Sequence, residues 1–445
     1  MKICTQLLFV LFFVISPSLF GQNVLDDILD EQARAQVVDE ILQDRMETLL
    51  PELMKREGID MWILISREYN EDPVMKTMLP STWLSARRRT MMVFSLNGEK
   101  LDKVAIARYS VGKLLRGEWN LNVYPDQWEA LMSIIQDKDP KTIGLNYSEN
   151  FALADGLVKT EYQTFMEKLP TGYEDRIVSA EKLAIAWLET RSPRERALYD
   201  TICAIGHQIL QEAFSADVIT AGKTTTDDVI WWLRNRVTDL GLDTWFHPSV
   251  SIQRSTMADN AFLRSFSSRP EDQIIQYGDL LHVDFGITYL RLNSDQQQHF
   301  YMLKPGETEI PQGLVKAFER GNRLQDILVS QFIPGKSGNQ ILRDALAQAK
   351  EEGITASIYT HPIGYHGHAA GPTIGLWDQQ GGVKGRGDYP LFANTAYSIE
   401  LFAASEVPEW NKIIRIMLEE DGIYEADGFR FLDGRAERIF SIPRQ

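Results

Sequence analysis

Hydrophobic residues between residues 33 and 56 recur at the three- and four-residue spacing of an amphipathic helix. Short apolar runs follow, and their content of β-branched and aromatic residues predicts strands. These runs are MWILIS, TMMVFSL and KVAIARY. The next segments alternate between helix and strand patterns: DQWEALMSIIQ, TIGLN and EYQTFMEKLP. This alternation predicts an α/β domain over residues 22–184.

A second pattern begins near residue 185. Ser192 followed by Pro193 is typical of the start of a helix, which continues through DTICAIGHQIL. Further helices are expected in TTTDDVIWWLRNRVTDLG, over 312–330 and in SGNQILRDALAQAKEEG. Strand patterns occur between them in GDLLHVDFGITYL, AYSIELFAAS and IIRIMLEEDGIY. The mixture predicts an α+β domain on a mostly antiparallel sheet over residues 185–445.

The N-terminus has the layout of a signal peptide. One Lys precedes an apolar run from Leu7 to Ile15, which is shorter than the roughly 20 residues that span a bilayer. We expect residues 1–21 to be removed, so that a periplasmic or secreted chain begins at Gln22 without a membrane span. An uncleaved anchor is the alternative. Cys4 would leave with the signal, and Cys203 falls in a helical pattern that predicts a buried core position.

The net charge of the chain limits the kinds of molecule that we expect it to bind. The chain of 445 residues has a formal net charge of −16, whereas nucleic acids and anionic membranes attract clustered Lys and Arg. We therefore expect no nucleic-acid partner. An acidic chain can still concentrate divalent cations at one point.

Several acidic residues interrupt apolar segments of the second half. Burying an unpaired carboxylate costs several kcal/mol. Taken singly, each such residue is typical of a strand end, and a His beside Pro and Gly is typical of a turn. As a set, their charges can offset one another only around cations, and oxygen ligands with one nitrogen suit Mn²⁺, Fe²⁺, Co²⁺ or Zn²⁺. The set comprises Asp284, Asp295, His361, Glu400 and Glu419.

The order of these motifs resembles the M24 metallopeptidase family, which includes methionine aminopeptidase, Xaa-Pro aminopeptidase, prolidase and creatinase. VDFG is followed by an Asp eleven residues after Asp284, then by HPIGYHGH, SIE and a late Glu. The resemblance implies a pita-bread fold after a creatinase-like N-terminal domain. It also implies that the five residues bind two divalent metal ions, with Mn²⁺ as first choice and Co²⁺, Zn²⁺ or Fe²⁺ as alternatives.

The same resemblance implies the activity. We expect an aminopeptidase or dipeptidase of Xaa-Pro type that acts on a short peptide or small molecule through a hydroxide bridging the metals. Glu400 would move protons as well as bind metal. His368, seven residues after His361, would contact the substrate and stabilise the tetrahedral intermediate.

Three departures from the family pattern concern residues around the ligands. The stretch FLRSFSSRP lacks the His that usually precedes the first Asp, so His282 or His247 could replace it. Arg264, in that stretch, could bind a substrate carboxylate. QQQHFYML follows the second Asp in place of a Thr-rich stretch, and Ala369 follows His368 where an acidic residue is common.

These departures keep other functions open. One alternative is a metal-dependent enzyme on the same fold that does not cut peptides, such as a lyase or another hydrolase. Another is a binding protein with weakened catalysis. A homodimer also stays open.

Overall fold

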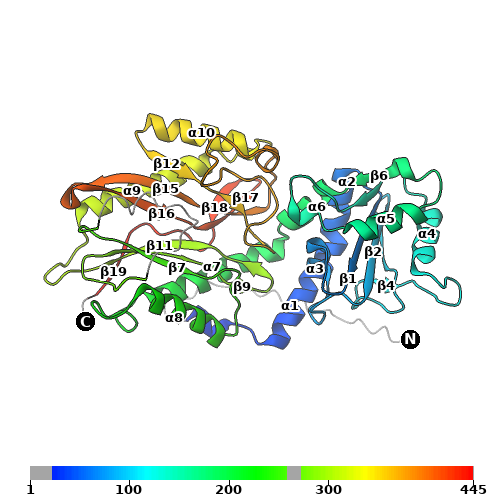
Figure 1. The fold of residues 1–445 in the computed structure, drawn as a ribbon, viewed down its shortest axis with the longest axis horizontal. Coiled ribbons are helices and arrows are strands. Elements are labelled where there is room, and N and C mark those ends of the chain that lie inside the picture. The colour runs from blue at the N-terminus through cyan, green and yellow to red at the C-terminus, as the bar shows by residue number, and fades with distance from the viewer. Residues whose placement is uncertain (1–22, 258–271, 444–445) are drawn as a thin grey trace, which may run out of the picture.

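The computed structural model describes residues 23–257 and 272–443. The described chain forms two lobes that lie side by side, with residues 31–189 mainly in one and residues 193–443 in the other (Figure 1). Within these residues, no helix has both the length and the apolar character needed to cross a membrane.

The first lobe is built on a six-stranded mixed sheet of order β4-β3-β2-β1-β5-β6. β1 pairs antiparallel with β2 and parallel with β5, so it lies at the centre of the sheet. The first two predicted apolar runs form β1 and β2, and TIGLN contains β5, as expected. KVAIARY overlaps β3 only in its first three residues. The bounds are β1 Met61–Arg67, β2 Arg89–Asn97, β3 Lys100–Ala105, β4 Arg116–Gly117, β5 Ile143–Leu145 and β6 Ile177–Ser179.

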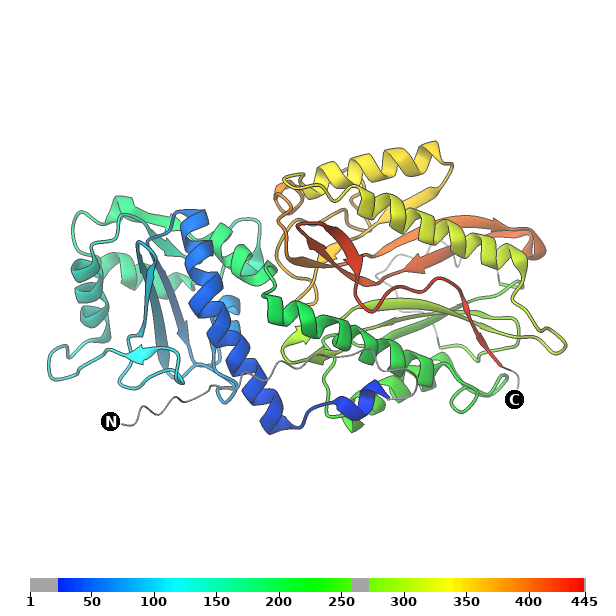
Figure 2. The ribbon, with the colours of Figure 1, turned by 180° about the vertical axis from the view of Figure 1, so that it is seen from behind.

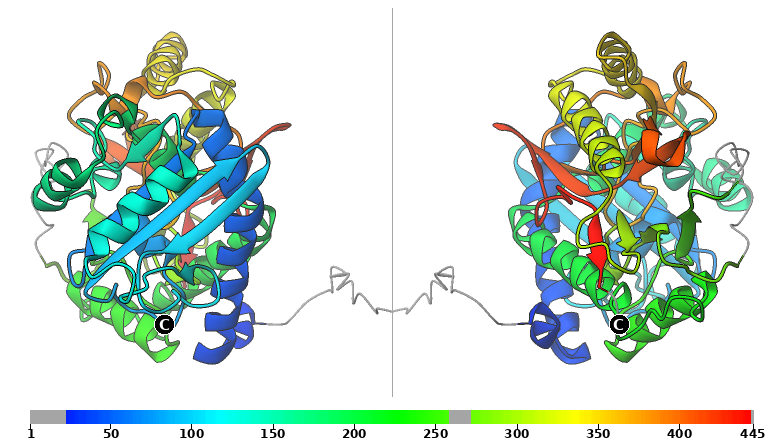
Figure 3. Two further views of the ribbon diagram at one scale, coloured as in Figure 1. Left: turned by 90° about the vertical axis from the view of Figure 1, so that its right-hand side faces the viewer. Right: turned by 90° about the vertical axis from the view of Figure 1, so that its left-hand side faces the viewer.

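Helices cover both faces of this sheet (Figure 3, left). Alternate residues of β1 explain the arrangement, because Trp62 packs in one buried cluster and Ile63 in another on the opposite face. The helix predicted over 33–56 is confirmed. It consists of α1 and α2, which one π-helical turn joins into a long continuous helix (Figure 2). The helices are α1 Glu31–Asp44, α2 Leu50–Glu57, α3 Pro73–Met78, α4 Gln127–Lys138, α5 Lys159–Lys168 and α6 Glu181–Glu189.

The second lobe contains three sheets and a short hairpin. Its sheets have the orders β19-β11-β8-β7, β12-β15-β16 and β13-β14-β17-β18, while β9 pairs with β10. Pairing is antiparallel except between β11 and β19, which agrees with the predicted α+β class. The strands are β7 Ser249–Gln253, β8 Leu280–Phe285, β9 Thr288–Tyr289, β10 Leu292–Asn293, β11 Gln296–Met302, β12 Thr355–Ile358, β13 His361–Pro362, β14 Thr395–Ser398, β15 Leu401–Val407, β16 Lys412–Leu418, β17 Asp421–Glu425, β18 Gly428–Phe431 and β19 Phe440–Ile442.

Four long helices flank these sheets, and all four were expected from the sequence. They are α7 Pro193–Ala213, α8 Thr226–Asp239, α9 Gln312–Ser330 and α10 Gly338–Glu351. Buried residues of α7 and α8 pack with Leu281 and Val283 of β8, and those of α9 and α10 pack with β15 and β16 (Figure 3, right). His282 and Asp284 alternate with these β8 residues, so their side chains face away from α7 and α8.

Three predicted strands are interrupted. GDLLHVDFGITYL breaks between β8, which ends at Phe285, and β9, which begins at Thr288. AYSIELFAAS was expected to be continuous, but β14 ends at Ser398 and β15 begins at Leu401. IIRIMLEEDGIY breaks in the same way between β16 and β17. The reason is a change of sheet: β14 pairs with β17, whereas β15 pairs with β16. Glu400 lies in the break between β14 and β15, and Glu419 lies in the break between β16 and β17. Both residues therefore stand where the chain passes from one sheet to another.

Candidate metal centre

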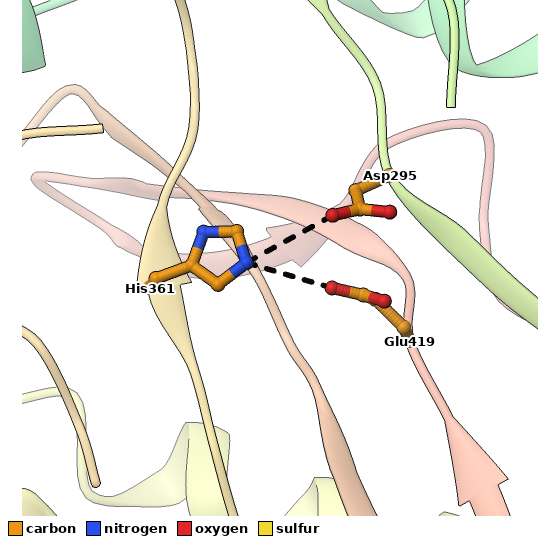
Figure 4. A group of neighbouring side chains, drawn as sticks. All are labelled: Asp295, His361 and Glu419. Atoms are coloured by element: carbon orange, nitrogen blue, oxygen red, sulfur yellow. Dashed lines mark ion pairs between the residues drawn. The ribbon is translucent and has the colours of Figure 1, made fainter. Parts of the chain in front are cut away.

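Three of the five predicted ligands converge in the second lobe. Asp295, His361 and Glu419 are buried, and each offers one ligand atom within 4.8 Å of the others. His361 Nε2 lies 3.6 Å from Glu419 Oε1 and 3.9 Å from Asp295 Oδ2 (Figure 4). A nitrogen and two carboxylate oxygens that face one point form a donor set suited to a divalent cation.

Each of these residues is held by the backbone around it. Asp295 immediately precedes β11, and its backbone N–H donates to Asp421 Oδ2 at 2.9 Å. His361 opens β13, where it pairs with Ser398 of β14. Ser398 Oγ donates a hydrogen bond to Glu419 Oε1. Hydrogen bonds at the ends of neighbouring strands therefore hold the three residues in place.

The hydrogen bonds of this cluster fit a metal. His361 Nδ1 lies 3.0 Å from Pro362 O, which requires its proton on Nδ1 and leaves the lone pair on Nε2. His361 Nε2 and Asp295 Oδ1 are buried without a hydrogen-bond partner among the described residues. Such unpaired buried atoms are costly, and cations bound at this cluster would supply their missing partners.

The remaining two predicted ligands lie at the edge of the same cluster. Glu400 is buried, and Gln297 Nε2 donates to its Oε1 at 3.0 Å. Asp284 on β8 is half-buried and pairs across the sheet with Gln297 of β11. Gln297 also donates to Glu419 Oε2 at 2.6 Å. The structure thus places all five residues around Gln297 and Glu419, with only three of them converging on one point.

Burial and mutual repulsion act on the carboxyl groups. Burial raises the pKa of Asp284, Asp295 and Glu400 well above the ordinary value. The negative charge of Glu419 raises all three further. Clustered acids with raised pKa values are typical of metal and catalytic centres, because a bound cation relieves the repulsion.

His368 lies at the exposed side of the cluster. Its ring packs edge-on against that of His361 at 4.7 Å and against Trp245 at 5.2 Å. Burial, reinforced by the nearby His361, lowers the pKa of His368 to about 4. The imidazole is therefore neutral near pH 7 and can donate a hydrogen bond to a substrate oxygen.

Sequence reasoning missed three residues of this site. Tyr359 Oη lies 3.4 Å from His368 Nε2, and burial together with Glu400 and Glu419 raises the Tyr359 pKa. Arg386 is exposed, and its positive charge contributes to lowering the pKa of His368. Gln297 contacts two ligands directly. Gln297 stands in the QQQHFYML stretch noted as a departure from the family pattern, but only tertiary contacts reveal the roles of the three residues.

The residues proposed to replace the missing His have different surroundings. His282 is buried, and its Nε2 lies 2.8 Å from Gln297 Oε1, so it contacts the amide and not open space. This position favours an internal contact over direct contact with substrate. His247 packs against Trp231 of α8. Arg264 lies outside the described residues.

Comparison with known proteins identifies the family to which the chain belongs. The model of metallopeptidase family M24 matches residues 197–430, which is more than half of the sequence. The chain belongs to metallopeptidase family M24. This M24 metallopeptidase thus contains the ligand types that the resemblance implied, within the matched segment. A comparison with curated protein sequences gives no significant match.

Solved structures confirm the fold over almost the whole chain. The X-Pro aminopeptidase of Thermotoga maritima aligns with a TM-score of 0.62 at 17% identity, covering 88% of this chain and 100% of that one. The Xaa-Pro dipeptidase of Bacillus anthracis aligns with a TM-score of 0.57 at 14% identity, covering 93% and 100%. The N-terminal domain of the FACT complex subunit SPT16 from Cicer arietinum also aligns, with a TM-score of 0.51 at 14% identity, covering 93% and 99%. At these identities the likeness shows the pita-bread fold with its N-terminal domain and not the substrate.

Proposed function

We propose that this M24 metallopeptidase is an aminopeptidase or dipeptidase of Xaa-Pro type that uses two divalent cations, with Mn²⁺ as first choice. The observation that carries the proposal is the convergence of Asp295, His361 and Glu419, with Asp284 and Glu400 beside them. Asp295 and Glu419 both face His361 Nε2, and both interact electrostatically with Asp284, so they would be the ligands shared by the two cations.

The five ligands would hold the cations, whose chemistry when bound is to polarise a substrate carbonyl and to acidify a water molecule. Glu400 would take the proton from the attacking water and pass it to the leaving amine. Its burial beside Glu419 supports this role, because these surroundings raise the pKa of Glu400 and so favour the uptake of a proton. His368 would donate a hydrogen bond to the oxygen of the carbonyl under attack.

Arg386 supports a preference for short substrates with a free C-terminal carboxylate. Its guanidinium has no ion-pair or hydrogen-bond partner within residues 23–257 and 272–443. Its positive charge nevertheless acts to lower the pKa of both Tyr359 and His368. An unpaired guanidinium near His368 can bind a carboxylate through two parallel hydrogen bonds. In the described part of the chain, Arg386 thus takes the role that the sequence suggested for Arg264.

The proposal is tested by turnover of matched substrates. Metal-reconstituted protein is expected to hydrolyse Xaa-Pro dipeptides, and Arg386→Ala is expected to raise KM for a dipeptide about 10- to 100-fold, because one charge-assisted contact is lost. The C-terminal amide of the same dipeptide should be a poor substrate for both proteins. Lys384→Ala, which removes an exposed cation two residues away, serves as the control and should behave as wild type.

Two outcomes of this experiment would contradict the proposal. Equal turnover of acid and amide, unaffected by Arg386→Ala, would remove the carboxylate contact. No hydrolysis of any peptide in the panel would favour a different reaction on the same fold.

We also propose that residues 1–21 direct export. The apolar run from Leu7 to Ile15 supports this, as described above. The expected result of N-terminal sequencing on protein from the native compartment is a chain that begins at Gln22. A mature chain that still carries Met1 in the cytoplasm would overturn the proposal.

A further inference from the structure

Three segments converge where the two lobes meet: α3 of the first lobe, the turn between β9 and β10, and the loop over residues 361–368. Arg291 in the turn donates from Nη1 to Leu79 O, directly after α3, at 2.7 Å. Asn293 of the same hairpin donates from its backbone N and from Nδ2 to Gly364 O, at 2.9 Å each. The hairpin is therefore bonded both to the first lobe and to the loop that carries His361 and His368.

Arg291 is a mostly buried cation at this junction. Burial lowers the pKa of its guanidinium, which means that its charge is poorly compensated. Asp39 is the nearby acid whose charge acts on it, but Asp39 Oδ1 accepts a hydrogen bond from Ser81 N instead. Within residues 23–257 and 272–443, no carboxylate forms an ion pair with Arg291. A buried charge without a counterion is costly, so an anion beside Arg291 would be stabilised.

The backbone of the turn is strained at the same place. Leu290 and Arg291 are its two central residues, and their φ angles are 53° and 66°. This left-handed conformation suits Gly and Asn, and is unfavourable for Leu and Arg. Strained residues persist where their surroundings hold them, and they cluster at ligand-binding sites. The bond to Leu79 O holds the guanidinium of Arg291 at the junction despite this strain.

His366, in the adjoining loop, is also without a partner. Its Nδ1 is buried and has no hydrogen-bond partner in the described part of the chain. Burial lowers the pKa of His366 to about 4, and the positive charges of Arg191 and Lys76 lower it further. Arg191 is paired with Glu195 at 3.4 Å. Lys76, exposed on α3, forms no ion pair with any described residue, so its charge stays available to a ligand.

This group of cations lies beside the candidate metal centre but apart from Arg386. His366 precedes His368 by two residues, so their Cα atoms are at most about 7 Å apart. Gly367 between them packs against the ring of Trp245, which also contacts His368 at 5.2 Å. The charge of Arg386 acts on His368, whereas other cations act on His366. A ligand at His368 thus has one source of positive charge at Arg386 and a second at the lobe junction.

We propose that Lys76, Arg291 and His366 bind a carboxylate of the substrate, separate from the carboxylate at Arg386. A guanidinium can hold a carboxylate through two parallel hydrogen bonds, and the ammonium and imidazole N–H groups add further donors. When Arg386 binds the C-terminal carboxylate of a dipeptide that ends in Pro, the second carboxylate is the side chain of the first residue. The substrate class is therefore dipeptides with an acidic residue before Pro. This inference rests on the proposed function, since it names the substrate of that same site.

The test compares Glu-Pro with Met-Pro, whose first side chains have similar length and differ in charge. Wild-type protein loaded with Mn²⁺ should show a kcat/KM about 10- to 100-fold higher for Glu-Pro, because charge-assisted hydrogen bonds form only with the carboxylate. Lys76→Met and Arg291→Met should each lower this ratio about 10-fold. The loss should appear as a higher KM for Glu-Pro, since the contact forms on binding and not only in the transition state.

Two further variants keep the test decisive. Arg291→Lys retains a cation in the turn and should keep part of the preference for Glu-Pro. Lys141→Met removes an exposed cation just before β5, at the end of the sheet opposite to α3, and should keep the wild-type ratio. If Arg291→Met does not fold, Lys76→Met decides the question, because the exposed Lys76 side chain contributes little to the fold.

Binding without turnover separates the inference from the proposed function. Analogues of both dipeptides with a reduced, uncleavable amide are titrated into the Mn²⁺-loaded protein by calorimetry. Tighter binding of the Glu-Pro analogue that depends on Lys76 and Arg291, without hydrolysis of any peptide, would support the site and contradict only the proposed reaction. Hydrolysis of both dipeptides with equal kcat/KM, or a preference that both variants leave unchanged, would overturn the site alone. Absence of both binding and hydrolysis would overturn both.

Discussion

Glu400→Gln is expected to lower the rate of peptide hydrolysis about 10²- to 10⁴-fold, the usual contribution of a positioned acid–base group. An amide cannot take up and release the proton that Glu400 would carry. The fold should persist, because Gln has the same shape and its oxygen can still accept the hydrogen bond from Gln297 Nε2. The change is measured as kcat at saturating Mn²⁺, with unfolding temperature as the check on the fold.

A control at a nearby acidic residue isolates the effect of the Glu400 carboxylate. Glu406 lies on β15, the strand that begins directly after Glu400, and the side chain of Glu406 is exposed. Glu406→Gln should keep the wild-type rate. A Glu400→Gln variant with full activity and unchanged metal content would remove Glu400 from the mechanism.

Glu419→Ala should have the largest effect on metal binding. Glu419 faces His361, accepts hydrogen bonds from Ser398 and Gln297, and raises the pKa of three neighbouring acids by its charge. Loss of a residue that orients a ligand typically costs 10- to 100-fold in metal affinity, so loss of a ligand shared by both cations should cost more than about 100-fold. Elemental analysis of protein purified without chelator should therefore find little metal.

The same substitution should not destabilise the metal-free protein strongly. Removing one negative charge from a buried acidic cluster reduces repulsion, which offsets the volume that is lost. Glu437→Ala, at an exposed acidic position, is the control and should keep the wild-type metal content. Glu419→Ala protein that retains wild-type metal content would show that the cations bind elsewhere.

Much of this architecture was predictable because it depends on local patterns. The helix expected over 312–330 has the bounds of α9. Both signals for it, the spacing of apolar residues and Pro311 just before its start, lie within the segment itself. The acidic residues inside apolar segments drew attention as candidate ligands for an equally local reason, and the family resemblance then implied the full set. A carboxylate surrounded by apolar neighbours needs a compensating partner wherever the chain folds.

Other features depend on contacts between distant segments. The breaks at Glu400 and Glu419 arise because each strand pairs with two different sheets, and periodicity within one strand cannot show this. Gln297 looked like a departure from the family pattern, and only its approach to Glu400 reveals a contact with the ligands. Arg386 is one more exposed cation in the sequence until the fold brings its charge near His368.

The central claim is that hydrolysis depends on cations held at this centre, and restoration of activity by metal tests it most directly. Chelator-stripped wild type should not hydrolyse an Xaa-Pro dipeptide, and added Mn²⁺ should restore turnover. The same addition should leave Glu419→Ala inactive, because that variant cannot hold the cations. Full hydrolysis by the stripped protein, or restoration in Glu419→Ala equal to that in wild type, would contradict the account.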